Sequence, residues 1–352
     1  LQGVNGYNNS DNNTAIGYQA LKAVNSGASN TAVGTLALAL NTTGSYNVAV
    51  GRNALDANTT GGTNTALGTQ TLSENTTASD NTAVGMSALH VNTTGASNTA
   101  VGAYALDANT TASYCTALGT SALGANVDTN SNTAIGYRSL WVNTGGSSNT
   151  AVGAYSLDAN TTGAQNVAVG AEALTANTTG DQNTSVGKDS MQANTTGDQN
   201  TACGKDALQY NTTASYNTGV GYMALRSNTT GAQNTAVGRT ALHTNSTAND
   251  NTAIGYNAMY SNTTGAQNTA VGKDALDANT TAHDNTAIGV GALGVMDGGL
   301  GKNIAVGNYS GDAITDGNSN NLVGYQAGTA ITSGSNNNFF GTLAGKSTTT
   351  AD

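Results

Sequence analysis

The sequence has 352 residues, of which 46 are glycine, 48 are asparagine and none is proline. Only 9% of the residues are charged and 5% are aromatic, and the formal net charge is −10. This composition argues against a catalytic globule, and ten Lys and Arg residues spread thinly along an acidic chain argue against nucleic acid as a partner.

Residues 1–12 precede the first complete repeat and are expected to form the N-terminal edge of the fold. Leu1 opens the chain without the charged, apolar and small-residue zones of a signal peptide. No apolar run approaches the ~20 residues that a membrane helix needs, so we expect no membrane insertion. Because the first residue is not methionine, we expect the chain to be a piece of a longer or processed protein.

A repeat of seventeen residues occupies positions 13–289. The glycine of an Asn-Thr-Ala-(Val/Ile/Leu)-Gly block recurs every seventeen residues from Gly17 to Gly289, which makes seventeen repeats in phase. Numbered from the first Asn as positions 1 to 17, the consensus is N-T-A-V-G-x-x-A-L-x-A-N-T-T-G-x-x, and residues 149–165 depart from it only at Ser156. A fixed short period is typical of a solenoid, in which each repeat forms one rung.

Each repeat is too short to fold alone, so it must stack on its neighbours. Positions 1 to 4 predict a short strand that ends at a glycine, and positions 12 to 15 predict a second corner. Positions 6 to 11 fit either a second strand or one helical turn. The sequence therefore predicts an all-β solenoid, or β-roll, of seventeen-residue rungs, and twenty rungs at ~4.8 Å give an elongated array of about 95 Å.

Two positions are predicted to form the core, because position 4 is aliphatic almost throughout and position 9 is Leu or Met in every in-phase repeat. Representative core residues are Val152, Leu157, Val169, Leu174, Val237 and Leu242.

Position 3 is predicted to lie at an interface between copies of the chain. It is Ala in sixteen of twenty repeats, and strand alternation places it on the face opposite position 4. One interpretation is that Ala151, Ala168 and Ala236 pack against another copy around a common axis. The alternative is that alanine at this position fills a narrow interior within a single chain.

The C-terminal part departs from the consensus. A Gly-rich stretch at 290–302 contains a one-residue insertion and is interpreted as a junction between two sub-arrays. Three variant repeats follow at 303–345, with Gly311, Gly328 and Gly345 at position 9 and with Ile314 and Ile331 at position 12, so we expect a rearranged core there. Residues 346–352 form a tail.

Blocks such as Asn30-Thr31-Ala32-Val33-Gly34 and Asn132-Thr133-Ala134-Ile135-Gly136-Tyr137 resemble the repeats of bacterial and phage tail-fibre-like proteins. They are also similar to the β-roll head repeats of trimeric autotransporter adhesins. The resemblance covers about residues 13–345 and implies a trimeric or larger extracellular fibre, on a cell surface or a virion, that presents a binding surface to a glycan receptor. The period of seventeen is longer than the usual adhesin-head unit, and the sequence contains no coiled-coil stalk, membrane anchor or C-terminal chaperone domain.

Residues with catalytic or metal-binding chemistry are few. His90, His243 and His283 occupy variable positions without a cluster of cysteines or carboxylates at metal spacing, and no nucleophile, base and acid arrangement stands out. The acidic residues are also scattered and lack a calcium-binding pattern. We therefore predict no enzyme, no cofactor and no metal.

The two cysteines are predicted to remain unpaired. Cys115 and Cys203 lie five rungs apart, which is too far for a disulfide. Cys203 stands at position 4 and is expected to be a small core residue.

The Asn-Thr-Thr corner at positions 12 to 14 admits three interpretations. The first is structural, with stacked Asn and Thr side chains that form hydrogen-bonded ladders. The second is glycosylation, because these corners are N-x-S/T sequons, for example at Asn41, Asn58, Asn160, Asn177, Asn228 and Asn279. The third is an ice- or glycan-binding surface made from the same ladders. The preferred function is a structural fibre or shaft of an extracellular appendage, adhesin or tail fibre, which supplies length, rigidity and surface presentation, and the alternative is an ice- or glycan-binding module.

Overall fold

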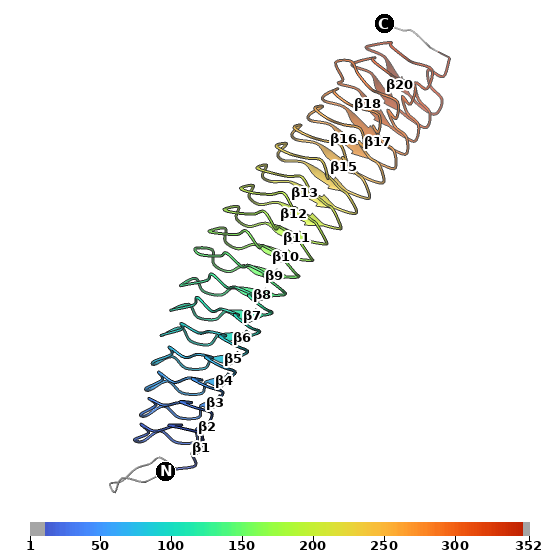
Figure 1. Ribbon diagram of the computed structural model, residues 1–352. Helices are drawn as coiled ribbons and strands as arrows, with labels where there is room; N and C mark the ends of the chain where they lie inside the picture. Colours follow the sequence, from blue (N-terminus) through green and yellow to red (C-terminus); the bar gives the residue numbers. More distant parts are fainter. Residues whose placement is uncertain (1–10, 348–352) are drawn as a thin grey trace. The chain divides into compact units, whose positions relative to one another are not determined.

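The computed structural model describes residues 11–347, which form one three-residue β-strand per repeat and contain no helix. The chain divides into two units, and the boundary lies between Thr179 and Gly180. In each unit, successive rungs stack as a parallel β-solenoid (Figure 1). The predicted all-β solenoid of seventeen-residue rungs is confirmed.

Ten strands belong to the first unit. They are β1 (Thr14–Ile16), β2 (Thr31–Val33), β3 (Val48–Val50), β4 (Thr65–Leu67), β5 (Thr82–Val84), β6 (Thr99–Val101), β7 (Thr116–Leu118), β8 (Thr133–Ile135), β9 (Thr150–Val152) and β10 (Val167–Val169).

Ten further strands belong to the second unit. They are β11 (Thr184–Val186), β12 (Thr201–Cys203), β13 (Thr218–Val220), β14 (Thr235–Val237), β15 (Thr252–Ile254), β16 (Thr269–Val271), β17 (Thr286–Ile288), β18 (Ile304–Val306), β19 (Asn321–Val323) and β20 (Asn338–Phe340).

Neighbouring strands within a unit pair in parallel and in register. Thr133 of β8 lies beside Thr150 of β9, and Ala134 lies beside Ala151. Because the register shift is one whole repeat, each position of the consensus forms a column that runs along the unit. Positions 2, 3 and 4 are the three strand residues of each repeat, so their columns form the β-sheet.

Position 3 of the strand faces inward. The predictions that position 4 lies in the core and that position 3 lies at an interface between copies are therefore wrong. Ala151, Ala168 and Ala236 are completely buried inside the isolated chain, so they line its own narrow interior and are not an interface between copies. Position 4 points the other way, and Val152 and Val169 are only half-buried. Val237 is half-buried as well, so none of the three predicted valines belongs to the interior.

Position 9 supplies the large interior side chain, as predicted. Leu157, Leu174 and Leu242 are completely buried. Small residues at positions 3 and 8 surround these leucines, and the interior therefore has room for one large aliphatic side chain per rung.

Positions 6 to 11 form neither a second strand nor a helical turn. Tyr155 and Leu157 both have positive φ, at 58° and 52°, which is uncommon for residues with large side chains. Their backbone N–H groups donate to Tyr137 O at 3.0 Å and to Ala173 O at 3.1 Å, in the rungs on either side. This alternating backbone satisfies its hydrogen bonds between rungs, which explains why neither helical nor strand periodicity describes it.

Glycine at position 5 is required by the turn that ends each strand. Gly153 has a φ of +134°, and a Cβ added there would lie 2.4 Å from the carbonyl oxygen of Gly170 in the next rung. Any side chain would collide with the neighbouring backbone.

The insertion within residues 290–302 does not interrupt the stack. Strand β17 pairs in register with β18 across the eighteen-residue step, so the extra residue is absorbed in the connecting turn. The interpretation of residues 290–302 as a junction between two sub-arrays stays a prediction.

The rearranged core expected in the variant repeats is present. Gly311 and Gly328 keep the positive φ of position 9, at 60° and 69°. Leu322, at position 3, fills the space that they leave, and Ile314 and Ile331 are completely buried at position 12. Residues 1–10 and 348–352 lie outside the described part of the chain, together with most of the predicted N-terminal edge and C-terminal tail.

Candidate functional site

The Asn side chains at positions 1 and 12 form two ladders inside the rungs. Asn58 Nδ2 donates to Asn41 Oδ1 in the preceding rung at 2.7 Å, and to Gly61 O in its own corner at 2.9 Å. The column at position 1 behaves similarly, because Asn47 Nδ2 donates to Gly61 O at 2.9 Å. The Gly61 carbonyl at position 15 thus receives amide hydrogens from both ladders, and the structural interpretation of the Asn corner is confirmed.

The position 1 side chain also satisfies the backbone of the next rung. Asn47 N donates to Asn30 Oδ1 at 3.0 Å, and Asn149 N donates to Asn132 Oδ1 at 2.9 Å. Buried backbone N–H groups need such a partner, because leaving one unpaired costs about 1–3 kcal/mol. The position 1 ladder therefore satisfies the backbone N–H group immediately before each of these strands begins.

Burial of the ladders corrects the glycosylation interpretation. The six sequon residues Asn41, Asn58, Asn160, Asn177, Asn228 and Asn279 are completely buried. For Asn160 and Asn228, side-chain hydrogen bonds run both to the preceding rung and to their own corner. A glycan on this nitrogen would break the ladder and has no space in the folded rung.

The two threonines of each corner behave differently. Thr161 is half-buried and its hydroxyl donates to Thr178 O at 2.9 Å, whereas Thr162 is exposed. The same contrast holds for Thr229, which donates to Ser246 O at 2.9 Å, and the exposed Thr230. Only one threonine per corner therefore faces solvent.

Cys115 takes a place in the position 1 ladder. It is buried, its thiol contacts Thr129 O at 3.4 Å, and burial raises its pKa. Cys203 is exposed because position 4 faces outward, so its predicted place in the core is wrong. Both cysteines are free thiols.

Position 10 is a half-buried column in which charge is disfavoured. Burial raises the pKa of Asp56, Asp158 and Asp312, all of which stand at this position. Burial likewise lowers the pKa of His243, with a smaller contribution from the Arg226 charge, and the His243 ring stacks on Tyr260 with centroids 5.0 Å apart.

Three successive position 10 residues bring together a serine, a histidine and an aspartate, which sequence inspection did not reveal. Ser73 Oγ lies 2.6 Å from His90 Nδ1, and Asp107 follows in the next rung. Burial raises the pKa of Asp107, while its backbone hydrogen bond and the His90 charge oppose this rise. Within residues 11–347 no hydrogen bond joins His90 to Asp107, and His90 Nδ1 instead lies near Ser73 Oγ and, at 3.3 Å, Gln70 O.

The remaining histidine is engaged in rung stacking. His283 Nδ1 accepts a hydrogen bond from Ala266 N at 2.9 Å. Residues 11–347 contain no group of three or more His, Cys, Asp or Glu side chains that could hold a metal ion.

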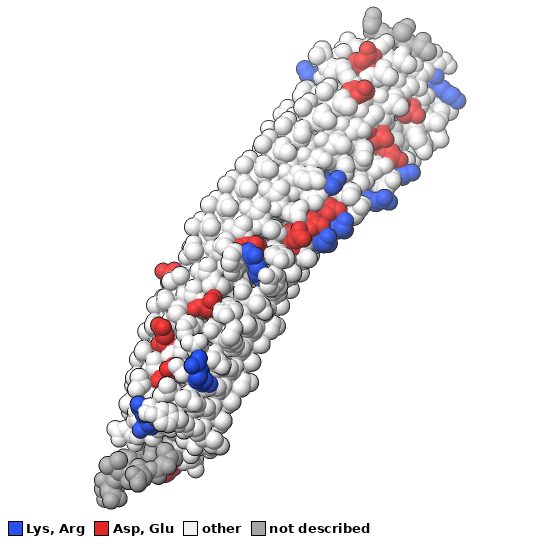
Figure 2. Space-filling model, viewed as in Figure 1, with Lys and Arg blue, Asp and Glu red and all other residues white. Residues whose placement is uncertain are grey.

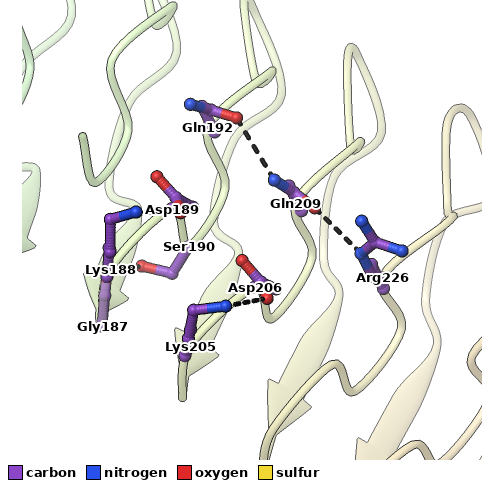
Figure 3. A network of polar contacts seen from close by, with 9 residues as sticks. All are labelled: Gly187, Lys188, Asp189, Ser190, Gln192, Lys205, Asp206, Gln209 and Arg226. Carbon is purple, nitrogen blue, oxygen red and sulfur yellow. Dashed lines mark hydrogen bonds and ion pairs between the residues drawn. The ribbon is translucent and has the colours of Figure 1, made fainter. Parts of the chain in front are cut away.

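Polar residues of the second unit form two groups of contacts, one between Lys205 and Asp206 and one among Gln192, Gln209 and Arg226 (Figure 3). Lys205 Nζ pairs with Asp206 at 2.8 Å, and this hydrogen bond raises the pKa of Lys205. Arg226 Nε donates to Gln209 Oε1 at 2.9 Å, and Gln209 Nε2 donates to Gln192 Oε1 at 3.3 Å. The contacts among Gln192, Gln209 and Arg226 bridge three successive rungs, whereas Lys205 and Asp206 are adjacent in one rung.

A comparable cluster lies on the first unit. The Arg138 guanidinium sits 3.8 Å from the centre of the Trp141 ring and 5.7 Å from that of Tyr155. Arg138 Nε also lies 3.4 Å from Asp158 Oδ1, in an ion pair that does not have hydrogen-bond geometry. Gly124 makes room for Trp141, because a Cβ there would lie 2.9 Å from the indole.

The outward-facing residues at positions 2 and 4 of the strands form a surface that we call the outer strand face. Exposed aliphatic side chains stand on it, including Ile16, Leu67, Leu118, Ile254 and Ile288, which are 40–61% exposed. Neither position carries a charged residue in any of the twenty strands. Figure 2 shows that charged groups are sparse and that much of the surface of each unit is uncharged.

Comparison with known protein families and with curated proteins finds no match to this chain. The described residues include no helix with the length and apolar character needed to cross a membrane. The functional interpretation therefore depends on the geometry of the rungs and on the residues that they expose.

Proposed function

We propose that the chain is a structural shaft, part of an extracellular appendage such as an adhesin or a tail fibre. The observation that supports this function best is the continuity of the buried Asn ladders through successive rungs, from Asn41 to Asn109 in the first unit and from Asn194 to Asn279 in the second. The regular rungs make the same contacts with one another, so length grows by adding repeats without a new core. Such a design supplies extension and stiffness.

Surface presentation follows from the same geometry. The variable positions 6, 7, 10, 16 and 17 lie away from the leucine and alanine interior, and they carry the lysines and aspartates of Figure 3 and the side chains of the Arg138 cluster. The ladder bonds use side chains of positions 1 and 12 instead. A shaft of this kind presents different side chains at its surface while the interior of each regular rung stays the same.

The alternative role, an ice- or glycan-binding module built on stacked Asn and Thr ladders, receives less support. The Asn side chains are completely buried, and the first Thr of each corner is bonded to the next rung. The ladders therefore offer an ice surface or a sugar only the second threonine of each corner.

Inserting whole rungs tests the shaft directly. Four extra copies of residues 64–80, placed after Asp80, keep every column in phase and should lengthen the particle by about 19 Å at ~4.8 Å per rung, with an unchanged cross-section. Small-angle scattering measures both quantities. A particle that thickens instead of lengthening would contradict the proposal, and a matched insertion of eight residues should disrupt folding because it breaks the register.

The extracellular location is tested separately. Antibodies against the exposed residues should label the surface of intact cells or particles of the source in electron micrographs. Labelling confined to the cell interior would contradict an appendage.

A further inference from the structure

The corner at residues 297–301 departs from the regular corners of the array because Met296 replaces the Asn of position 12. An Asn at this position bonds its own corner, as Asn279 Nδ2 does to Ala282 O at 3.2 Å. The side chain of Met296 is completely buried and has no N–H to donate. The position 12 ladder of the second unit, which runs from Asn194 to Asn279, therefore ends before this corner.

The position 1 ladder continues past the corner without bonding it. Asn285 Nδ2 donates to Asn268 Oδ1 at 3.0 Å, and no hydrogen bond within residues 11–347 joins this amide to residues 297–301. In the next repeat, by contrast, Asn303 Nδ2 donates to Gly317 O of its own corner at 2.9 Å. The corner at 297–301 thus lacks the side-chain hydrogen bonds of both ladders.

The residue that makes this repeat eighteen residues long lies in the same corner. Thr280 Oγ1 donates to Asp297 O across the regular step of seventeen residues. Asn303 N donates to Asn285 Oδ1 across a step of eighteen. The register therefore changes between Asp297 and Asn303, and the extra residue enlarges a corner that the ladders do not bond.

The backbone of this corner has hydrogen-bonding groups without partners in the chain. Within residues 11–347, the N–H groups of residues 299–301 donate to no other residue, and the carbonyls of residues 298–300 accept from none. A corner N–H in a regular rung is bonded to the rung beside it, as Thr263 N is to Thr280 O at 2.9 Å. An enzyme can therefore bind this segment without first breaking contacts between rungs.

Leu300 presents an accessible side chain on this corner. It is 74% exposed, more than any other large apolar residue of the described chain. Elsewhere an exposed aliphatic residue has a bonded backbone, since Leu40 is 49% exposed but its N–H donates to Asp56 O at 3.1 Å. Leu67, which is 46% exposed, lies in the paired strand β4. Leu300 thus combines an exposed side chain with an unpaired backbone.

We propose that the Gly299–Leu300 peptide bond is a cleavage site for an endopeptidase whose pocket accepts the large aliphatic side chain that follows the cut bond. Exposed corners with small residues are preferred sites of nicking in folded proteins. Hydrolysis adds one water molecule across the bond, so that Gly299 gains a carboxylate and Leu300 gains a free amino group. The cut separates the seventeen regular repeats from the three variant repeats in the covalent chain.

Cleavage leaves both pieces in the stack. Strand β17 pairs with β18 across the corner, and Leu293 N donates to Ser310 O at 3.0 Å. Asn303 N also donates to Asn285 Oδ1 at 3.1 Å. None of these contacts uses a residue of the corner, so the two pieces should stay together until the rungs unfold.

Limited proteolysis of the folded chain by thermolysin tests the site, because this enzyme cuts before large aliphatic residues. The first cut within residues 11–347 should give fragments that end at Gly299 and begin at Leu300, as identified by mass spectrometry. The nicked protein should run as one particle in size-exclusion chromatography under native conditions and as two fragments in urea.

Two variants separate the effect of the side chain from that of the open backbone. Leu300→Ser keeps the corner but removes the side chain that the pocket binds, so cleavage should slow on the order of 10- to 100-fold. Met296→Asn with Gly301 deleted keeps the bond before Leu300 but restores the ladder Asn and the period of seventeen, so cleavage should slow by at least about 10-fold. The matched control Leu40→Ser alters an exposed leucine whose backbone is bonded, and it should be cut like the wild type.

Three results would overturn the proposal. They are a first cut at any other bond within residues 11–347, cleavage that occurs only when circular dichroism shows global unfolding, and equal rates for the wild type and the variant with the restored ladder. Each of them leaves the shaft function untouched, because rung insertion tests that function separately.

Discussion

Asparagine is the residue that most distinguishes this interior from an ordinary core. Buried amides usually destabilise a protein unless every donor and acceptor is paired. Here the side chain of Asn160 donates to Asn143 Oδ1 and to Gly163 O, each at 2.9 Å, and accepts from Asn177 Nδ2 at 2.9 Å. Each residue is thus bonded to the same residue in both neighbouring rungs, and the interior stays polar without unpaired groups.

Asn160→Ala should therefore be strongly destabilising. The substitution leaves the Asn143 oxygen and one Asn177 hydrogen without partners inside the rung, at a cost of about 2–5 kcal/mol. Urea unfolding followed by circular dichroism measures the loss. The control Thr162→Ala changes an exposed side chain two residues away and should shift stability by less than about 0.5 kcal/mol. Equal effects would contradict the buried ladder.

The position 10 aspartates predict an unusual dependence of stability on pH. Burial, followed by repulsion from Asp274, raises the pKa of Asp277 in the folded chain. Below the unfolded pKa the carboxyl is neutral in both states and has no effect. As the pH rises from there through the folded pKa, the charged form is penalised only in the folded state, so this group destabilises the protein at neutral pH.

Asp277→Asn should consequently raise the melting temperature at pH 7 and leave it nearly unchanged well below the unfolded pKa. Thermal unfolding of both proteins across this pH range gives the comparison. A variant that is less stable than the wild type at pH 7 would show that the carboxylate makes a favourable contact there.

At the scale of the element, the three-residue strand explains why the sequence predicted the solenoid but misassigned its faces. The fixed period and the Leu at position 9 identified the rung and its buried side chain, as at Leu157. The Thr-Ala-Val strand offers two possible phases that differ by one residue, and either Ala151 or Val152 could face inward. Apolar character favours the valine, but the interior is already filled by Leu157 and the Asn ladders and has space only for alanine.

Sequence periodicity also could not predict the backbone conformation of positions 6 to 11. Leucine rarely adopts positive φ, so no propensity indicates the turn at Leu157. Its hydrogen bond to the next rung and the complete burial of its side chain stabilise that conformation. The sequence predicted the Asn ladders. It did not predict that they lie inside the rung, because their position depends on this turn.

The variant repeats show compensation between positions 9 and 3. A Cβ at Gly328 would lie 2.8 Å from Leu322 Cδ2, so leucine at both positions cannot fit. Gly328→Leu should destabilise the second unit by about 1–3 kcal/mol. Adding Leu322→Ala restores the consensus pair of residues and should recover most of the loss in a double-mutant cycle followed by chemical unfolding. Additive losses would contradict direct contact between these positions.

At the scale of the whole molecule, the described residues form two stacks of ten strands, each with its own ladders. Contacts between neighbouring rungs carry the stability of such a stack, so a local defect loosens the nearest rungs first. The shaft proposal rests on one premise about the regular rungs. Position 3 faces the interior and position 4 faces outward, as at Ala151 and Val152.

Cysteine accessibility in one rung tests this premise most directly. Ala151→Cys and Val152→Cys, each in a Cys203→Ser background, place single probes on the two faces of β9, and only an accessible thiolate reacts with a maleimide. We expect the thiol at position 151 to stay unreactive until the chain unfolds. The thiol at position 152 should react while the fold persists. The reverse pattern, with position 151 reactive and position 152 protected in the folded chain, would contradict the account.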